Sequence, residues 1–261
     1  MKKKILYIPA VLVLLWTAFT GAVRIAVRDV VSDDVVGRAY VLRMNDVIYM
    51  NKDIEDIDKA VELQNSMQKD PAIRSITMKY MDAAVQSIAY DMPFAAPDIA
   101  KQEDKLASHV CAKTEKEGIT LDRDLLQESI TDATDSLTYA VQSMTSDGWY
   151  DYAVPWLRPA ASLWYYTVTP GFALCLTVCG IFFLTCATKM NDISTTGKTV
   201  ILTGGLELVL GFMTAGGSLA LTNKILGRSL FLSLTPFLCM GVAIILCGVF
   251  LYRMGKRKYL K

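Results

Sequence analysis

Histidine and cysteine are scarce in the part of this chain that could carry chemistry in water. His109 is the only histidine among 261 residues, and Cys111 is the only cysteine outside four long apolar stretches. A structural zinc site needs four ligands, and these two residues supply only two. A lone cysteine cannot form a disulfide within its own domain. His109 is therefore interpreted as an exposed, structurally neutral side chain, and no metal, cofactor or enzymatic activity is predicted.

Two ligand-binding motifs are also incomplete. The acidic run from 51 to 62 has offsets similar to a calcium-binding loop, but Asp56 stands where that loop needs a glycine for its turn. Gly197-Lys198-Thr199 ends like a phosphate-binding loop, but Asp192 occupies the position of the first glycine. Both matches are rejected.

Charged residues are almost absent from four stretches, which cover 5–23, 163–188, 199–221 and 230–252. Glu207 is the only Asp, Glu, Lys or Arg inside them. Each is close to the roughly 20 helical residues that cross a hydrocarbon core. The sequence therefore predicts an integral membrane protein with four transmembrane helices, the first separated from the other three by a polar segment over 24–160.

Lysine and arginine set the predicted orientation, because short basic loops resist translocation. Ten of them lie in the segments 1–4, 189–198 and 253–261, whereas the short loop 222–229 has two. Both termini are thus predicted to be cytoplasmic, in the plasma membrane, with 24–160 outside. An alternative is that the first stretch is a signal peptide cleaved near Thr20 and Ala22, which would leave three spans and the same outer location.

The outer segment is acidic, and this limits its partners. Residues 24–160 contain 24 acidic and 15 basic residues, a net charge of −9, whereas the remainder has 12 basic and 2 acidic residues. A negative domain disfavours nucleic acid and anionic lipid and attracts cations or basic proteins. A protein partner at this domain is the prediction, besides the lipid bilayer around the spans.

Helical periodicity and capping residues predict a helical bundle outside the membrane. Helices are expected over 52–69, 72–90, 98–116 and 122–144, and 26–50 is expected to continue the first span as helix. The fold class is therefore all-α, with four transmembrane helices arranged as one plus three and a helical extracytoplasmic domain inserted between the first and second spans.

Aromatic residues crowd the outer end of the second predicted span. Rings with a polar edge settle at the headgroup level, so the cluster predicts an interfacial belt, while a ligand-binding aromatic cage is the alternative. Its members are Trp149, Trp156, Trp164, Tyr165 and Tyr166.

Glu207 lies on a stripe of small and polar residues along the third predicted span. On a helical wheel, Thr203, Gly204, Gly211, Thr214 and Ser218 all fall within about 60° of it. One interpretation is a cation or proton site, because an ionisable residue at this depth is costly and usually functional. The other is a protonated acid that hydrogen-bonds to Thr203, Thr214 or a partner protein as packing.

Small-residue faces on the other two late spans predict a compact helical bundle and also permit homo-oligomers. These faces are Cys175, Cys179 and Cys186 on the second span, and Cys239, Ala243 and Cys247 on the fourth.

The layout of anchor, helical outer domain, three closely spaced spans and Lys/Arg-rich tail resembles that of small uncharacterised membrane proteins of Gram-positive bacteria. Tetraspanins and claudins differ, because their outer loops carry paired cysteines. Two functions are hypothesised. The first is a non-enzymatic interaction or sensor module that acts through the acidic outer domain, and the second is a small transport or channel component that uses Glu207.

Overall fold

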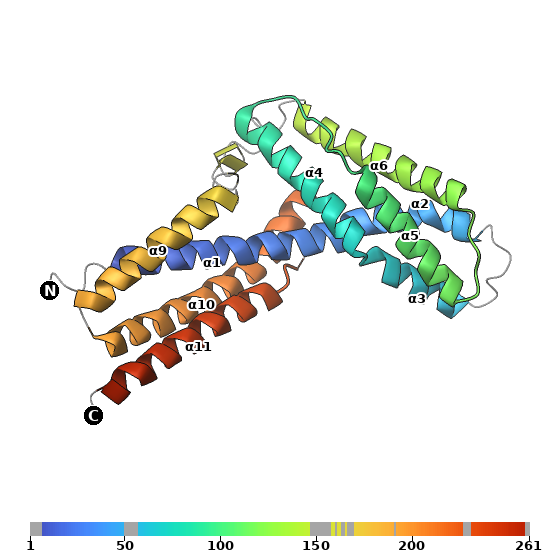
Figure 1. Ribbon diagram of the computed structural model, residues 1–261. Helices are drawn as coiled ribbons and strands as arrows, with labels where there is room; N and C mark the ends of the chain where they lie inside the picture. Colours follow the sequence, from blue (N-terminus) through green and yellow to red (C-terminus); the bar gives the residue numbers. More distant parts are fainter. Residues whose placement is uncertain are drawn as a thin grey trace. The chain divides into compact units, whose positions relative to one another are not determined.

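The computed structural model describes residues 7–49, 57–146, 158–159, 161–162, 165, 170–190, 192–226 and 231–258. All regular secondary structure in these ranges is helical, which confirms the predicted class (Figure 1). The chain divides into two compact units. Met1–Val27 and Tyr166–Lys261 form the first, called here the membrane unit, and Arg28–Tyr165 forms the second, called here the outer domain after the location expected from the sequence.

The N-terminal helix continues without a break through three helical segments: α1 (Tyr7–Val30), the π-helix η2 (Val31–Val36) and α2 (Gly37–Tyr49). The helix predicted over 26–50 is thus confirmed as far as Tyr49. The π-helical turn closes with a bond from the Gly37 N–H to the Ser32 carbonyl. A Cβ at Gly37 would lie 2.3 Å from the Gln68 carbonyl oxygen, so only glycine admits this close approach.

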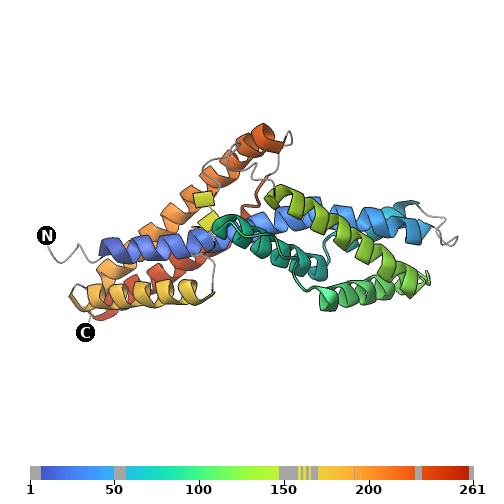
Figure 2. The same cartoon turned by 90° about the horizontal axis from the view of Figure 1, so that it is seen from above.

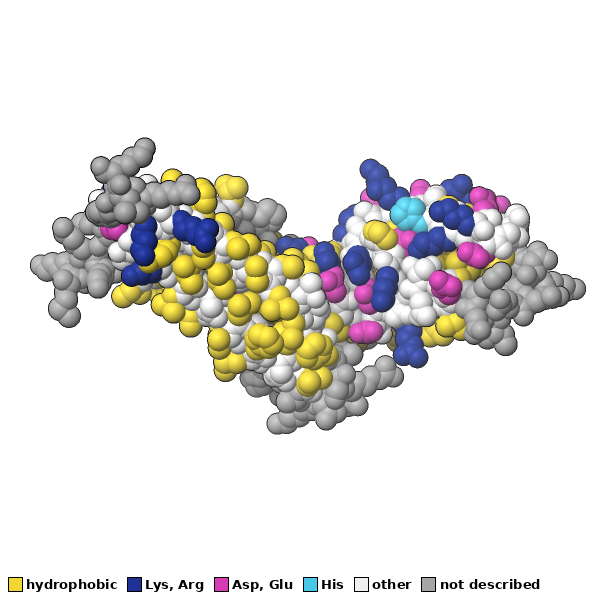
Figure 3. All heavy atoms as spheres, turned by 90° about the horizontal axis from the view of Figure 1, so that it is seen from below, with side chains coloured by type: hydrophobic (Ala, Val, Ile, Leu, Met, Phe, Trp, Pro, Cys, Tyr) yellow, Lys and Arg dark blue, Asp and Glu magenta, His cyan; other side chains and the backbone are white. Residues whose placement is uncertain are grey.

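Three helical stretches are long and apolar enough to cross a membrane: Tyr7–Ile48, Ile193–Leu219 and Thr235–Lys256. They overlap most of the first, third and fourth predicted spans. In place of the second, α9 (Pro170–Met190) carries a shorter apolar segment, Leu174–Cys186. These helices support a membrane location, and apolar side chains cover much of one face of the membrane unit (Figure 3).

Helix ends and apolar stretches do not coincide in the membrane unit. The helix α10 (Ile193–Leu226) has 34 residues, about 51 Å at 1.5 Å per residue, against a hydrocarbon core of roughly 30 Å. It begins close after α9 because the Asp192 carbonyl already accepts the N–H groups of Thr195 and Thr196, at 3.0 and 3.1 Å. Lys189 and Lys198, assigned to a loop from sequence, therefore lie in helices.

The outer domain is a helical bundle around one apolar core. Besides α2 it contains α3 (Ile57–Gln68), α4 (Pro71–Tyr90), α5 (Ala100–Lys116) and α6 (Arg123–Ser146), seen from two directions in Figures 1 and 2. Each helix contributes buried side chains three or four residues apart, which is the spacing of one helix face. They include Tyr40, Met44 and Ile48; Leu63 and Met67; Ile73, Ile76 and Tyr80; Leu106 and Val110; and Leu126, Ile130 and Ala133.

Local capping explains where these helices begin and end. The Asp70 carboxylate accepts the Ala72 N–H at 2.8 Å, and Asp98 and Asp122 accept the N–H groups two residues onward at 3.3 and 2.9 Å. Gly118 has a φ of 78° just after α5, the left-handed conformation that suits glycine at a helix end. The predicted helices over 72–90, 98–116 and 122–144 are therefore confirmed, and the described part of 52–69 is helical from Ile57.

Hydroxyl groups link four of these helices inside the core. The Thr134 hydroxyl donates to the Glu103 carboxylate at 2.5 Å and lies 2.7 Å from the Tyr40 hydroxyl. One turn along α6, Thr138 lies 2.6 Å from the Tyr80 hydroxyl. Burial raises the pKa of Tyr80, which keeps this phenol a neutral hydrogen-bonding group. Apolar periodicity did not reveal this network, since its members come from α2, α4, α5 and α6.

Candidate intramembrane carboxyl site

The site is built on a close antiparallel pair, α10 and α11 (Thr235–Lys258), which lie side by side in Figures 1 and 2. Glycines recur every seven residues on both facing surfaces. They are Gly197, Gly204 and Gly211 on α10, and Gly241, Gly248 and Gly255 on α11. Membrane helices gain little from the hydrophobic effect, so small residues that let backbones approach are what hold such a pair together.

The distances at these glycines leave no room for a side chain. A Cβ at Gly204 would lie 2.7 Å from the Gly241 carbonyl oxygen, and one at Gly248 would lie 2.7 Å from the Ile201 backbone nitrogen. By contrast, nothing lies within 4 Å of a Cβ at the neighbouring Gly205. Only one side of α10, the side that carries Gly204, is therefore packed closely against α11.

Glu207 lies beside this packed surface with its side chain fully buried, at 0% exposure. The structure brings the predicted stripe together on the inner side of α10, where Thr203, Gly204, Gly211 and Ser218 are also buried and Thr214 is partly so. Glu207 is thus enclosed by the protein's own helices.

Neither carboxylate oxygen of Glu207 has a hydrogen-bond partner among the described residues. The two threonine hydroxyls nearest along the stripe are directed elsewhere. Thr203 donates to the Thr199 carbonyl at 3.0 Å, and Thr214 donates to the Leu210 carbonyl at 2.8 Å. The hydrogen bonds to Thr203 or Thr214 that the structural interpretation proposed are therefore not formed in this conformation.

Among the described residues, Glu207 forms no ion pair with a basic side chain. The closest basic residue toward the start of α10 is Lys198, about 13 Å away along the helix axis. The Lys198 ammonium lies 5.7 Å from the centre of the Tyr252 ring at that end. An ionised carboxylate in this position would be buried and unpaired, which costs several kcal/mol.

Contacts on either side of Glu207 along α10 join α1, α9, α10 and α11. Toward the start of α10, the Thr196 hydroxyl lies 2.7 Å from the Tyr7 hydroxyl and 3.1 Å from that of Thr188. Toward its other end, Phe237 packs with Phe19 at 5.9 Å between ring centroids and with buried alanines of α1. The carboxyl lies between these two anchoring points along α10.

The cysteine faces do not pack within the chain as the sequence suggested. Cys175, Cys179, Cys239 and Cys247 are exposed, and Cys186 is half-buried. On α11 the surface that packs against α10 is instead the glycine repeat. The sequence contains this repeat, but the helix-packing prediction did not use it. Seven-residue glycine spacing on two consecutive apolar helices was the signal that could have found it.

The predicted aromatic belt lies largely outside the described residues. Trp149, Trp156, Trp164 and Tyr166 are not described. Tyr165 is described and packs edge-on against Tyr90 in the outer domain, with centroids 5.1 Å apart and planes at 82°. This contact fits either a belt or a ligand cage.

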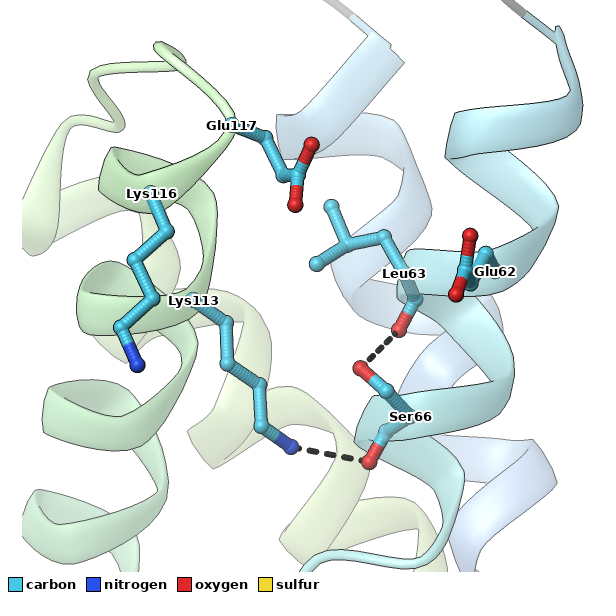
Figure 4. A pocket seen from close by; sticks show the side chains of 6 residues that line it. All are labelled: Glu62, Leu63, Ser66, Lys113, Lys116 and Glu117. Carbon is cyan, nitrogen blue, oxygen red and sulfur yellow. Dashed lines mark hydrogen bonds between the residues drawn. The ribbon is translucent and has the colours of Figure 1, made fainter.

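The outer domain has a shallow hollow of about 280 Å³ between α3 and α5 (Figure 4). Leu63 and Glu117 point toward one another across it, and Lys113 donates to the Ser66 carbonyl at 2.8 Å. The remaining lining residues are Glu62, Ser66 and Lys116. Its mixed charges and open form give it no evident chemistry, and the described residues contain no group of three metal ligands.

His109 is partly exposed but not structurally neutral, which corrects the sequence interpretation. Its Nδ1 lies 3.0 Å from the carboxylate of Asp70, whose side chain is 1% exposed. The Lys113 ammonium lies 3.4 Å from the other oxygen of the same carboxylate. Asp70 therefore caps α4 and anchors α5 at once, a role that only the tertiary arrangement reveals.

Comparison with protein-family models, curated proteins and solved structures finds no match for this chain. The likeness to small Gram-positive membrane proteins accordingly rests on layout alone.

Proposed function

We propose that this protein spans the membrane four times, with both termini in the cytoplasm and the outer domain outside. The three long apolar helices and the basic ends support this topology. To test it, a cysteine is introduced at the exposed Ser108 of a variant without native cysteines. A membrane-impermeant maleimide should label it in intact cells, and labelling only after lysis would reject the topology.

Within that topology, the outer domain is an interaction or sensor module without catalytic activity of its own. The supporting observation is that it closes on its own core while its charged residues and a few large side chains remain at the surface (Figure 3). Tyr139 on α6 is 75% exposed. Tyrosine is enriched at the energetic centres of protein interfaces, so Tyr139 is a suitable probe position.

The test is photo-crosslinking in intact cells from Tyr139, replaced by a photoreactive amino acid. One dominant, saturable protein adduct is expected, and a basic surface on that protein would fit the net acidity of the domain. The same crosslinker at Phe212, an exposed position of α10, serves as the control. Equal protein adducts from both positions, or none from Tyr139, would contradict the module.

A second candidate function is a small transport or channel component that acts through Glu207. The observation that favours it is the buried carboxyl without a partner. Purified protein in liposomes should carry a proton or cation flux that Glu207→Gln abolishes. Asp192→Asn, which alters a carboxylate before α10, should leave the flux unchanged. A flux that survives Glu207→Gln would reject this function.

A further inference from the structure

The buried carboxyl group of Glu207 has no hydrogen-bond partner among the residues that the structure describes. A carboxyl group in an apolar environment has strong hydrogen-bonding capacity, and leaving it unmet costs free energy. The described helices supply neither a hydrogen bond nor a counter-charge to its oxygens. A ligand that removes the charge of the ionised carboxylate must therefore come from outside the described residues.

The enclosure of Glu207 restricts the size of that ligand. Because the side chain is 0% exposed, a side chain of another protein or of a second copy cannot reach it unless α10 separates from its neighbours. The ligand is thus small, which argues against a macromolecular partner at this position.

The glycines on either side of Glu207 restrict the ligand further. A Cβ at Gly204 would lie 2.7 Å from the Gly241 carbonyl oxygen, and one at Gly211 would lie 2.5 Å from the Cβ of Phe237. Both helices are therefore in direct contact one turn before and one turn after the carboxyl. Hard cations such as Mg²⁺ and Ca²⁺ take six or more oxygen ligands, and this packing leaves little room for them.

None of the titratable groups on the described parts of the surrounding helices hydrogen-bonds to Glu207. On α10 the nearest is Lys198. Those on the other helices of the membrane unit are Tyr7 and Arg24 on α1; Cys175, Cys179, Cys186 and Lys189 on α9; and Cys239, Cys247, Tyr252, Arg253, Lys256, Arg257 and Lys258 on α11.

From these observations we propose that Glu207 is a reversible proton-binding site, held as a neutral acid at rest. The inference rests on the second function proposed above and names its ligand. The binding step is an O–H bond formed between a carboxylate oxygen and a proton from hydronium, and release is its reversal. A proton requires no coordination shell, removes the buried charge and fits the space that the glycine contacts leave.

The test uses the full-length protein in liposomes and a hydrophobic carbodiimide. A protonated carboxyl adds across a carbodiimide C=N bond, and the adduct rearranges to a stable N-acylurea without a leaving group. Mass spectrometry of the peptide that contains Glu207 measures the labelled fraction. Labelling should be high at low pH and fall at least tenfold as pH rises, with no labelling of that peptide in Glu207→Gln.

Two variants and one competition make the result decisive. Glu207→Asp keeps the acid and should retain pH-dependent labelling, whereas Gly205→Ala, on the open side of α10, should match the natural chain. Sodium or potassium at constant pH should not protect the site. Protection by either ion would show that the site binds that cation, and would contradict the proposal that its ligand is a proton. Labelling that does not change with pH would overturn reversible proton binding, as would the absence of labelling at every pH in a preparation in which mild detergent opens the helix pair to the reagent.

The same preparation separates the two proposals. A pH-dependent adduct without proton flux upholds the binding site and rejects transport. Flux that persists in Glu207→Gln rejects a transport role for Glu207, and the labelling experiment still decides whether the proton is bound.

Discussion

The two units of this protein pack their helices by opposite means. In the outer domain, α2 to α6 bury large side chains such as Met44, Ile76 and Leu126. In the membrane unit, α10 and α11 meet at glycines, and large apolar side chains such as Phe212 and Phe250 are 56% and 65% exposed. In water, large side chains stabilise a core because they leave the solvent. In lipid they gain little by leaving it, so backbone proximity decides the packing.

The largest expected effect is a cavity in the outer core. Ile76→Ala should lower the free energy of unfolding of this domain by about 4 kcal/mol, because the Ile76 side chain is fully buried in the core of the domain and its truncation leaves a void. Denaturant unfolding followed by circular dichroism measures it. Val61→Ala, at a 46% exposed position, is the control and should change little. Equal effects at both positions would mean that the core is not closed as described.

The complementary change in the membrane unit adds volume instead of removing it. Gly204→Leu should destabilise the α10–α11 pair by about 3 kcal/mol, because the new side chain meets the Gly241 carbonyl and Ile245. Unfolding by sodium dodecyl sulfate in mixed micelles provides the measurement. Gly205→Leu, one residue along the chain and facing open space, should be tolerated. If Gly205 is the more sensitive position, the packed side of α10 is misassigned.

A smaller effect is expected at Asp70, which joins helices through polar contacts. Asp70→Ala removes the cap of α4 and the contacts to His109 and Lys113, and should cost about 1–2 kcal/mol of domain stability. His109→Ala should cost less, since that side chain is 46% exposed. Thermal unfolding of both variants tests the order, and a larger loss at His109 would contradict it.

The smallest expected effect concerns Tyr80. Tyr80→Phe loses the hydrogen bond to Thr138, worth about 1 kcal/mol at neutral pH. Because burial raises the pKa of Tyr80 above its unfolded value, the natural domain loses stability as pH rises beyond about 10, where the unfolded phenol ionises first. The difference between the natural chain and Tyr80→Phe should therefore shrink at alkaline pH. Tyr139→Phe, at an exposed position, is the control, and a constant difference across pH would refute the assigned burial effect.

Local sequence signals were sufficient to predict most helices of the outer domain. Asp70 and Asp122 precede helices whose first N–H groups their carboxylates accept, because a cap is made within two or three residues. The π-helical turn was not predictable in this way. It places Gly37 against the Gln68 carbonyl, a contact between residues 31 positions apart.

Apolar length and charge distribution alone determined that the chain has long segments suited to a membrane, because the cost of placing charge in lipid depends on composition. The position of Glu207 on a small polar stripe was likewise readable from 3.6-residue periodicity. Only the tertiary structure decided that its carboxyl is enclosed, unpartnered and flanked by glycine contacts. Enclosure and pairing depend on which surfaces of other helices meet α10, and periodicity within one helix carries no information about its neighbours.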